Sequence, residues 1–177
     1  MNLKTLFYSA SAFLILSSLI VIRSNKIKAS SIPTTTGKVK EIEQPYCIQM
    51  YDAIMKYAEM YNIPKRFAFG IAYAETRYSG PFDWNYNHMK TSSAGAIGPM
   101  QIMPSTGKLM WKDSTFTKED LKNNIDFNVH TSMKLLRKLY DKYRDWKIVF
   151  GCYNTGKPLV NGYANSVFNH KINWNLN

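Results

Sequence analysis

Hydrophobic and polar positions divide the chain into three parts. An apolar run from Leu6 to Ile22 follows Lys4 and is closed by a group of basic residues. Residues 24–44 are polar and show no period that could bury one face. From Pro45 onward, apolar residues recur at steps of three and four, the spacing of an α-helix. We therefore expect a flexible tether at 24–44 and a globular domain at 45–177.

The apolar run approaches the length of a membrane span and exceeds the core of many signal peptides. Basic residues are denser behind it than before it, which leaves its orientation in a membrane open. No clear small-residue cleavage site follows. Residues 1–23 are therefore expected to be a signal peptide or an uncleaved membrane anchor, with a buried core helix as the alternative.

The pattern of the domain predicts helices throughout. Strand pairs and internal repeats are missing from the sequence, so the expected fold class is all-α. Residues 77–98 form a long loop whose aromatic residues argue against disorder. The expected helices run from Tyr46 to Tyr61, from Phe67 to Thr76, from a Ser105 cap to Trp111, from Asn124 along an amphipathic face to Tyr143, from Trp146 to Tyr153 and from about Leu159 to His170, with a short turn at Thr117–Asp120.

Charge narrows the choice of partner only slightly. The 177 residues carry a formal net charge of +11. Six of the 23 basic and two of the 12 acidic residues lie in the first 44, which leaves +7 on the domain. Such a charge favours cell-wall polymer, an acidic membrane surface or nucleic acid. No RNA-binding or helix-turn-helix signature accompanies it, so nucleic acid is not expected.

Cysteine and histidine residues give no sign of a metal or cofactor. Cys47 and Cys152 could form a disulfide in an oxidising compartment. Each lies on an apolar helical face, where a free thiol acts as a small hydrophobe, and this favours two unpaired cysteines. The three histidines lack metal-ligand spacing, so neither a metal nor a cofactor is expected.

The most informative candidate for chemistry is Glu75, at the end of the apolar helix Phe67–Thr76. A carboxyl group in such a place is poorly solvated, and burial penalises its ionised form. Its pKa then rises, and the group becomes a usable proton donor near neutral pH. The glycine-rich segment Gly95–Pro104 that follows is too apolar for a plain linker and is typical of a wall around a ligand. This pattern predicts an acid–base enzyme.

Several motifs resemble the soluble lytic transglycosylase family, whose members have a lysozyme-like fold and cleave the glycan of peptidoglycan. The resemblance covers residues from about 46 to 170, nearly all of the domain. It implies an all-α lysozyme-like lytic transglycosylase domain behind the hydrophobic segment and tether. The matching blocks, in the order of the family, are Ala74-Glu75-Thr76, Gly95-Ala96-Ile97-Gly98-Pro99-Met100-Gln101-Ile102-Met103-Pro104, Cys152-Tyr153-Asn154-Thr155-Gly156 and the weaker Tyr163-Ala164 with Val167.

Three positions depart from the usual pattern of the family. Thr76 replaces a Ser and keeps its hydroxyl, and Cys152 replaces an Ala. Asn161 and Gly162 stand where the family commonly has an acidic residue before the tyrosine.

The resemblance implies a reaction that needs one carboxyl group, whereas ordinary glycosidases use two. Glu75 would protonate the oxygen of the MurNAc-GlcNAc β-1,4 bond, and the acetamido group of the substrate would stabilise the developing cation. The same carboxylate would then take the proton of the muramic acid 6-hydroxyl, which closes a 1,6-anhydro ring.

The resemblance also implies the roles of the residues around Glu75. Thr76, Tyr153 and Asn154 would belong to the substrate-binding site, together with Met100 and Gln101 along the sugar. Tyr163 would orient the Glu75 carboxyl group. Tyr153 as a plain core residue is the alternative for that position.

Two other functions remain open. Asp83 lies in the loop after Glu75, and a second carboxylate facing a bound sugar would permit lysozyme-type hydrolysis, as in a muramidase. The alternative for Asp83 is to order the loop. A non-catalytic glycan-binding assembly module is the second rival.

The resemblance implies peptidoglycan strands as the substrate, and peptidoglycan has no cytoplasmic form that would suit this enzyme. The expected location is therefore exported, periplasmic or in the cell envelope, with possible anchoring in the inner membrane through the N-terminal segment. A secretion, conjugation or phage assembly is a possible partner.

Overall fold

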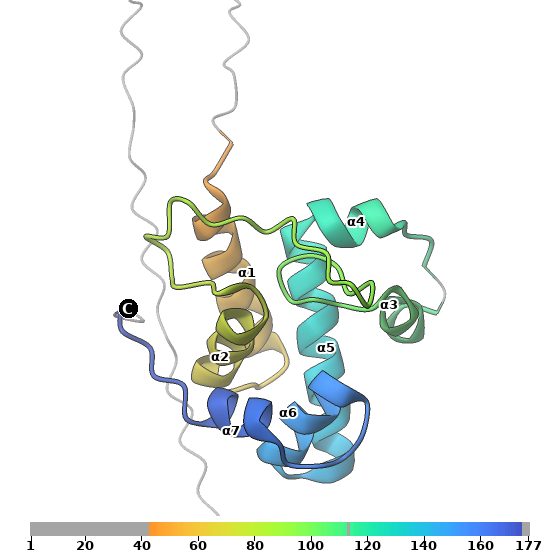
Figure 1. Cartoon of the computed structure of the whole chain (residues 1–177). Coiled ribbons are helices and arrows are strands. Elements are labelled where there is room, and N and C mark those ends of the chain that lie inside the picture. The colour runs from red at the N-terminus through yellow and green to blue at the C-terminus, as the bar shows by residue number, and fades with distance from the viewer. Residues whose placement is uncertain (1–42, 113, 175–177) are drawn as a thin grey trace, which may run out of the picture. The chain divides into compact units, whose positions relative to one another are not determined.

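The computed structural model describes residues 43–112 and 114–174. The order of the helices (Figure 1) is α1 Tyr46–Met60, α2 Lys65–Thr76, α3 Pro104–Met110, α4 Lys118–Asn123, α5 Ile125–Tyr143, α6 Trp146–Thr155 and α7 Gly162–Phe168. The described part contains two isolated β-bridges and no named strand. The expectation of an all-α domain is confirmed.

The expected signal peptide or anchor at 1–23, and almost all of the expected tether, lie outside the described residues. Among the helices that are described, none combines the length and the apolar character that a membrane crossing requires.

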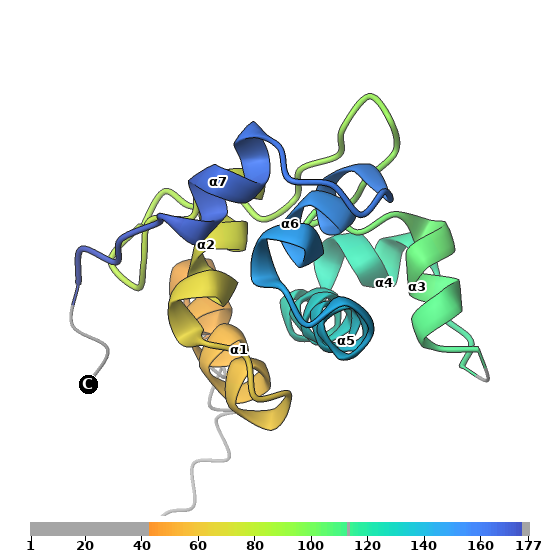
Figure 2. The ribbon, with the colours of Figure 1, turned by 90° about the horizontal axis from the view of Figure 1, so that it is seen from below.

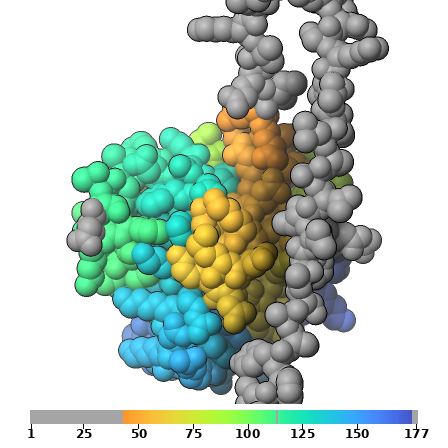
Figure 3. Space-filling model, turned by 180° about the vertical axis from the view of Figure 1, so that it is seen from behind, coloured from red at the N-terminus to blue at the C-terminus, as the bar shows by residue number. Residues whose placement is uncertain are grey.

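Helix α5 is the central element of the core. It packs against α1 and α6 (Figure 2), while α4 lies at its amino-terminal end (Figure 1). Helix α2 packs against α1 and α7. Apolar residues of α5 at the predicted three- and four-residue steps are fully buried, including Val129, Met133 and Leu136. Seen from behind, α1 and α5 form neighbouring parts of one face, with α3 and α4 beside them (Figure 3).

Side-chain caps start the helices α4, α5, α6 and α7. Asn124 accepts a hydrogen bond from the Phe127 amide at 2.9 Å and starts α5. Gly156 ends α6 with φ +74°, in the left-handed region that favours glycine. Thr117, expected only to start a short turn, forms a capping box with Asp120 and begins the helix α4.

Two predicted helix ends are wrong. Ser105 does not cap α3, because the helix already begins at Pro104 and ends at Met110. The last helix begins at Gly162, where the Asn161 side chain accepts from the Ala164 amide at 2.9 Å, and not near Leu159.

The reason for the late start of α7 is a close approach of main chains. A Cβ atom on Gly151 of α6 would lie 1.6 Å from the carbonyl oxygen of Leu159. Residues 157–161 pass close against α6 without helical structure, and the Leu159 amide donates to the Lys157 carbonyl at 2.9 Å in a tight turn.

Both cysteines are free and buried. Cys47 is 1% exposed in α1 and Cys152 is 9% exposed in α6, and they act as small apolar residues of their helices. The expectation of unpaired cysteines is confirmed.

A buried asparagine holds the long loop between α2 and α3 onto the core. Asn128 of α5 has no exposed surface, and its amide nitrogen donates to the carbonyl oxygens of Ile97 at 2.9 Å and Leu121 at 2.7 Å. Its side-chain oxygen accepts from the Met100 amide at 2.9 Å. Gly98 fits the same contact, because a Cβ atom there would lie 2.4 Å from the Leu121 carbonyl oxygen.

We predict that Asn128→Ala lowers the free energy of unfolding by about 2–4 kcal/mol, because the Met100 amide and the Leu121 carbonyl lose a buried hydrogen bond and the Ile97 carbonyl loses one of its two. Urea denaturation followed by circular dichroism measures the change. Asn165→Ala, on the exposed side of α7, is the matched control and should stay within about 0.5 kcal/mol of the parent. An Asn128→Ala variant as stable as this control would contradict the role assigned to Asn128.

Candidate active site

Glu75 lies in the last turn of α2, where a buried helix meets the loop. Residues Phe67 to Ala72 of this helix are buried, and Thr76 is its last residue. Arg77 follows in the left-handed conformation, with φ +61°, and turns the chain away. The helix thus holds the Glu75 side chain half-buried at the edge of the core.

One side-chain hydrogen bond orients the carboxyl group. The Tyr163 hydroxyl donates to Oε1 of Glu75 at 2.5 Å. Tyr163 is the second residue of α7, so this bond joins two helices whose residues are 88 positions apart. Lys90 approaches from the loop, and its ammonium group donates to the main-chain carbonyl of Glu75 at 2.5 Å.

Burial dominates the electrostatics of Glu75. Loss of solvent raises the pKa of its carboxyl group, while the Tyr163 hydrogen bond and the positive charge of Lys90 act in the opposite direction and offset only part of the rise. The net pKa lies above that of an ordinary glutamate. A protonated Glu75 can donate a proton, and after donation the tyrosine hydroxyl is in place to stabilise its anion.

Two partly buried tyrosines lie close to this carboxyl group. Burial raises the pKa of Tyr153 and of Tyr163, and the negative charge of Glu75 raises both further. The Tyr153 hydroxyl donates to the Met100 carbonyl at 2.7 Å and lies 2.9 Å from the Ser132 hydroxyl. Since its hydroxyl is engaged on protein partners, Tyr153 joins α6 to α5 and to the loop beneath Glu75.

Thr76 also makes its contacts within the protein. Its hydroxyl lies 2.9 Å from the Pro99 carbonyl, 2.9 Å from the Tyr86 hydroxyl and 3.2 Å from the Ala72 carbonyl. These bonds tie the end of α2 to Tyr86 within the long loop and to Pro99 near its far end. The structure therefore gives Thr76 a positioning contact next to Glu75.

Met100 differs from the expectation of a sugar contact. Its side chain has no exposed surface and belongs to the hydrophobic core. A side chain buried in this way cannot touch a glycan in this structure. The reason is its main chain, which is held from two sides by Asn128 and Tyr153 and turns the side chain inward.

Gln101 is the more accessible member of the same segment. Ile97 and Ile102 pair through two main-chain hydrogen bonds of 3.0 Å, and Gln101 lies within the tight turn between them with φ +48°. Its amide nitrogen donates to the carbonyl oxygens of Gly98 at 2.8 Å and Lys90 at 3.0 Å. The loop backbone thus fixes the amide, whose oxygen remains as an acceptor.

Asn154 is exposed, at the end of α6. Its side-chain oxygen accepts from Nδ2 of Asn161 at 3.1 Å, and the Asn161 oxygen caps α7. Asn154 therefore supports the start of the helix that carries Tyr163. The structure brings Glu75 and Tyr163 into direct contact, with Thr76 and Tyr153 packed around them, and gives Met100, Gln101 and Asn154 supporting places.

Sequence reasoning missed two residues of this arrangement, Asn128 and Lys90. Asn128 had a visible signal, since it is a polar residue three positions after Ile125, within the apolar stripe of α5. Lys90 lies in the loop and reaches the end of α2 through a contact that no periodic pattern marks.

Asp83 has protein partners of its own. Its carboxylate accepts from the Ser79 hydroxyl at 2.9 Å and from the Ser79 amide at 3.4 Å. These bonds close a turn in the loop, consistent with an ordering role. Phe82 and Trp84 beside it are 72% and 65% exposed, so they do not pack the loop onto the core.

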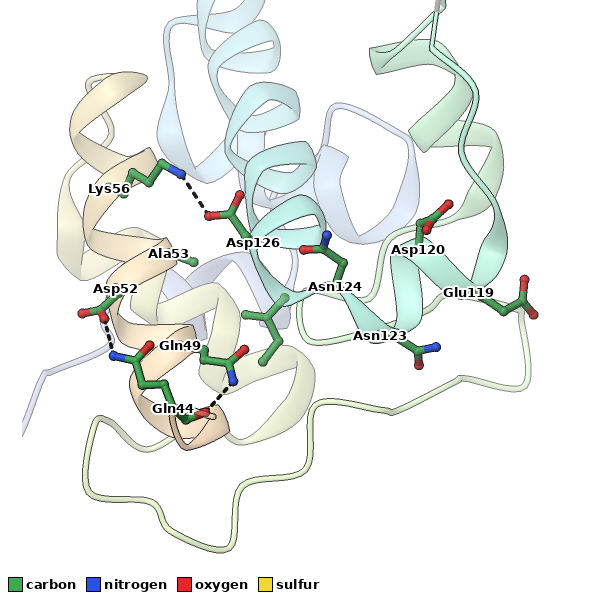
Figure 4. A pocket seen from close by; sticks show the side chains of 11 residues that line it. Gln44, Gln49, Asp52, Ala53, Lys56, Glu119, Asp120, Asn123, Asn124 and Asp126 are labelled. Atoms are coloured by element: carbon green, nitrogen blue, oxygen red, sulfur yellow. Dashed lines mark hydrogen bonds and ion pairs between the residues drawn. The ribbon is translucent and has the colours of Figure 1, made fainter. Parts of the chain in front are cut away.

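A cavity of about 530 Å³ lies elsewhere in the described part of the chain (Figure 4). It is formed by α1, α4 and the start of α5, and none of the predicted site residues lines it. Within it, Lys56 and Asp126 form an ion pair at 3.1 Å, and Gln44 donates to Asp52 at 2.9 Å. Within residues 43–112 and 114–174, no group of three or more His, Cys, Asp and Glu side chains could hold a metal ion.

Comparison with known proteins identifies the family of this chain. The model of the transglycosylase SLT domain matches residues 52–175. A transglycosylase of Enterobacteria phage PRD1 is 27% identical over 131 residues, which are 73% of this chain and 44% of that protein. The chain thus spans less than half the length of this curated relative.

Solved structures support the fold. The 70 kDa soluble lytic transglycosylase of Escherichia coli matches with a TM-score of 0.51 and 24% identity, over 66% of this chain and 18% of that one. Its complex with bulgecin A matches with the same values. At this identity the likeness establishes the fold, and the expected lysozyme-like architecture is confirmed.

The raised pKa of Glu75 makes a prediction about stability. Between the pKa of an unfolded glutamate, about 4.3, and that of Glu75, the native state binds more protons than the unfolded state. Its free energy of unfolding therefore falls as pH rises through this window. Glu75→Gln cannot titrate, so its stability relative to the parent should grow between pH 4 and pH 7.5, by about 1.4 kcal/mol for each tenfold difference in acid dissociation constant.

Denaturant titrations of both proteins at the two pH values measure this. Glu59→Gln, at an exposed position of α1, is the matched control and should give a smaller difference. If the advantage of Glu75→Gln were the same at both pH values, or smaller at pH 7.5, the raised pKa would be wrong.

Proposed function

Because the chain belongs to the transglycosylase SLT domain family, we propose that it is a lytic transglycosylase that cleaves the glycan of peptidoglycan, with Glu75 as its acid and base. One observation carries the proposal. Within the region that matches the family, a half-buried carboxyl group with a raised pKa accepts a hydrogen bond from a tyrosine on another helix. The transglycosylases to which the chain is similar are longer proteins, so their activity is extended to this chain as a proposal.

The proposed reaction proceeds in two proton transfers. Glu75 first protonates the oxygen that joins MurNAc to GlcNAc, and the bond from C1 to that oxygen breaks as the acetamido group stabilises C1. The Glu75 carboxylate then takes the proton of the 6-hydroxyl of the same muramic acid. A bond forms between that oxygen and C1, which gives a 1,6-anhydromuramic acid end and returns Glu75 to its protonated form.

The neighbours of Glu75 have distinct parts in this proposal. Tyr163 orients the carboxyl group and stabilises its anion between the two transfers. The amide oxygen of Gln101 accepts a hydrogen bond from an acetamido group or hydroxyl of the sugar, because its nitrogen is already engaged. Thr76, Tyr153 and Asn154 act by holding the elements that carry these groups.

Lysozyme-type hydrolysis is the second candidate and would need another carboxylate. Asp83 is the acidic residue in the loop after Glu75, and its bonds to Ser79 favour an ordering role. A non-catalytic glycan-binding module is the third candidate. The raised pKa of Glu75 argues against it, since a module that only binds glycan gains nothing from a carboxyl group whose ionised form is disfavoured.

The proposed substrate sets the proposed location. Peptidoglycan lies outside the cytoplasm, so the domain acts in the periplasm or cell envelope. Residues 1–23 would deliver it there as a signal peptide, or hold it at the inner membrane as an anchor. One relative comes from a phage, and a phage, secretion or conjugation assembly is a possible setting.

The products of digestion test the proposed activity. We expect purified sacculi treated with the protein to release muropeptides with 1,6-anhydro ends, identified by mass spectrometry, because the 6-hydroxyl and not water attacks C1. Glu75→Gln should reduce release at least about 100-fold, the usual contribution of a general acid or base. Glu59→Gln is the control and should release the same products at the same rate. Full activity of Glu75→Gln would contradict the assignment.

Replacement of Asp83 separates the two cleavage mechanisms. We expect Asp83→Asn to keep its products and to change the rate less than about tenfold, since it loses a turn contact and no reacting group. Reducing ends from the parent protein, together with loss of cleavage in Asp83→Asn, would instead identify a muramidase.

Removal of the tyrosine hydroxyl should change the pH profile. In Tyr163→Phe the Glu75 anion loses a hydrogen bond, so the pKa of Glu75 rises further and the alkaline limb of the cleavage rate moves to higher pH. The maximal rate should fall about tenfold or more because the carboxyl group is less well oriented. Turbidity loss of sacculi between pH 4 and pH 9 measures both effects. Tyr143→Phe, at the end of α5, is the control, and a profile of Tyr163→Phe that matches it would contradict the role of Tyr163.

A further inference from the structure

The side chain of Lys90 reaches from the long loop to the end of α2. Its ammonium group donates to the main-chain carbonyl of Glu75 at 2.5 Å. This carbonyl is one of the last four of α2, which ends at Thr76, and such carbonyls have no partner within their own helix. A lysine in this place also opposes the partial negative charge of the helix end. A cation is therefore held at the residue that carries the candidate acid.

The main chain of Lys90 belongs to the segment that carries Gln101. The Lys90 carbonyl accepts from the Gly98 amide at 2.8 Å and from the side-chain nitrogen of Gln101 at 3.0 Å. Gly98 in turn packs against Asn128 of the core. The base of the lysine side chain is thus fixed to the segment that presents Gln101, and its tip is fixed to the residue that carries the acid.

Lys90 acts on the Glu75 carboxyl group through its charge and not through contact. Within the described part of the chain, no ion pair includes Glu75. The titratable groups that face this carboxyl group are Tyr163 of α7, Tyr153 of α6 and Lys90 of the loop. Both tyrosines are neutral near pH 7, because burial raises their pKa. Lys90 therefore supplies the positive charge that opposes the effect of burial on the pKa of Glu75.

Another cation lies close in the sequence but is directed elsewhere. Arg77 follows Glu75 by two residues, and its guanidinium lies 5.2 Å from the centre of the Tyr73 ring. Arg77 and Lys90 are both exposed. The two influences that lower the pKa of Glu75 come from Tyr163 and Lys90, and Arg77 supplies neither. Arg77 is therefore a matched control for the charge of Lys90.

We propose that Lys90 is a positioning residue of the candidate active site, which holds the end of α2 next to the Gln101 segment and stabilises the Glu75 anion by its charge. The inference rests on the proposed function, since this anion forms between the two proton transfers. Salt screens the charge of an exposed side chain, whereas it hardly affects the hydrogen bond of the partly buried Tyr163. The acid strength of Glu75 then depends on ionic strength. A lysine that only capped α2 would give no such dependence.

The titration of Glu75 in the whole chain tests the charge of Lys90. Carbon NMR follows the Glu75 carboxyl group against pH in the parent, Lys90→Met, Lys90→Arg and Arg77→Gln. We expect Lys90→Met to raise the pKa of Glu75, because the anion loses a nearby positive charge. Lys90→Arg keeps a positive charge in place and Arg77→Gln keeps Lys90, so both variants should titrate like the parent.

The response to salt tests the same charge without a substitution. The titrations are repeated at about 20 mM and about 500 mM sodium chloride, which bracket weak and strong screening. High salt should raise the pKa of Glu75 in the parent toward that of Lys90→Met, and should change that of Lys90→Met much less. Should Lys90→Met fail to fold, the parent alone decides, because a pKa of Glu75 that high salt leaves unchanged or lowers overturns the inference.

Release of muropeptides from sacculi measures the consequence for cleavage. In Lys90→Met the alkaline limb of the rate should move to higher pH, and the maximal rate should fall about threefold, the size expected for one exposed charge. The reason is that a weaker acid protonates the bridging oxygen less readily. Lys90→Arg should restore both the limb and the rate. Arg77→Gln, which loses the same charge against the anionic cell wall, should keep the limb of the parent.

Three outcomes overturn the inference. They are an unchanged pKa of Glu75 in Lys90→Met, an equal rise in Arg77→Gln, and a parent whose Glu75 does not respond to salt. Failure here is separable from failure of the proposed function. If the parent releases anhydro ends from sacculi while Lys90→Met shares its pH profile, only the role of Lys90 is wrong. If Lys90→Met raises the pKa of Glu75 but the parent releases no product, the charge effect stands and the proposed function is wrong.

Discussion

The structure around the candidate active site depends on keeping one carboxyl group poorly hydrated without leaving it unpaired. Glu75 meets both conditions. It follows the buried part of α2, and the Tyr163 hydroxyl, 88 residues away in the sequence, donates a hydrogen bond to its Oε1. Full burial without the tyrosine would make the anion too costly to form, and full exposure would return the group to an ordinary acid. The balance between burial and this single hydrogen bond sets what the group can do.

The rest of the domain supports that balance from two sides. Asn128 seats the glycine-rich turn on α5, and Tyr153 holds the Met100 carbonyl from α6. On the other side, Asn154 and Asn161 fix the start of α7, which carries Tyr163. The polar residues beside Glu75 therefore act mainly by bonding to main-chain groups, so that the loop and helices stay in place around one acid.

Short-range patterns predict the helices and the place of Glu75, whereas long-range contacts decide what the loop residues do. The steps of three and four in α5 and the Asn124 cap are local signals, and both are found as expected. The burial of Met100 is different, since a partner 28 residues away fixes its main chain. The start of α7 was missed for the same reason, because a close approach of Leu159 to Gly151 determines it.

The central claim is that Glu75 keeps its proton at a pH where an ordinary glutamate has lost it. Carbon NMR of the side-chain carboxyl, assigned by comparison with Glu75→Gln and followed as the pH is raised, measures this pKa directly. The account predicts a midpoint clearly above the ordinary value of about 4.3. A midpoint at or below that value would contradict it.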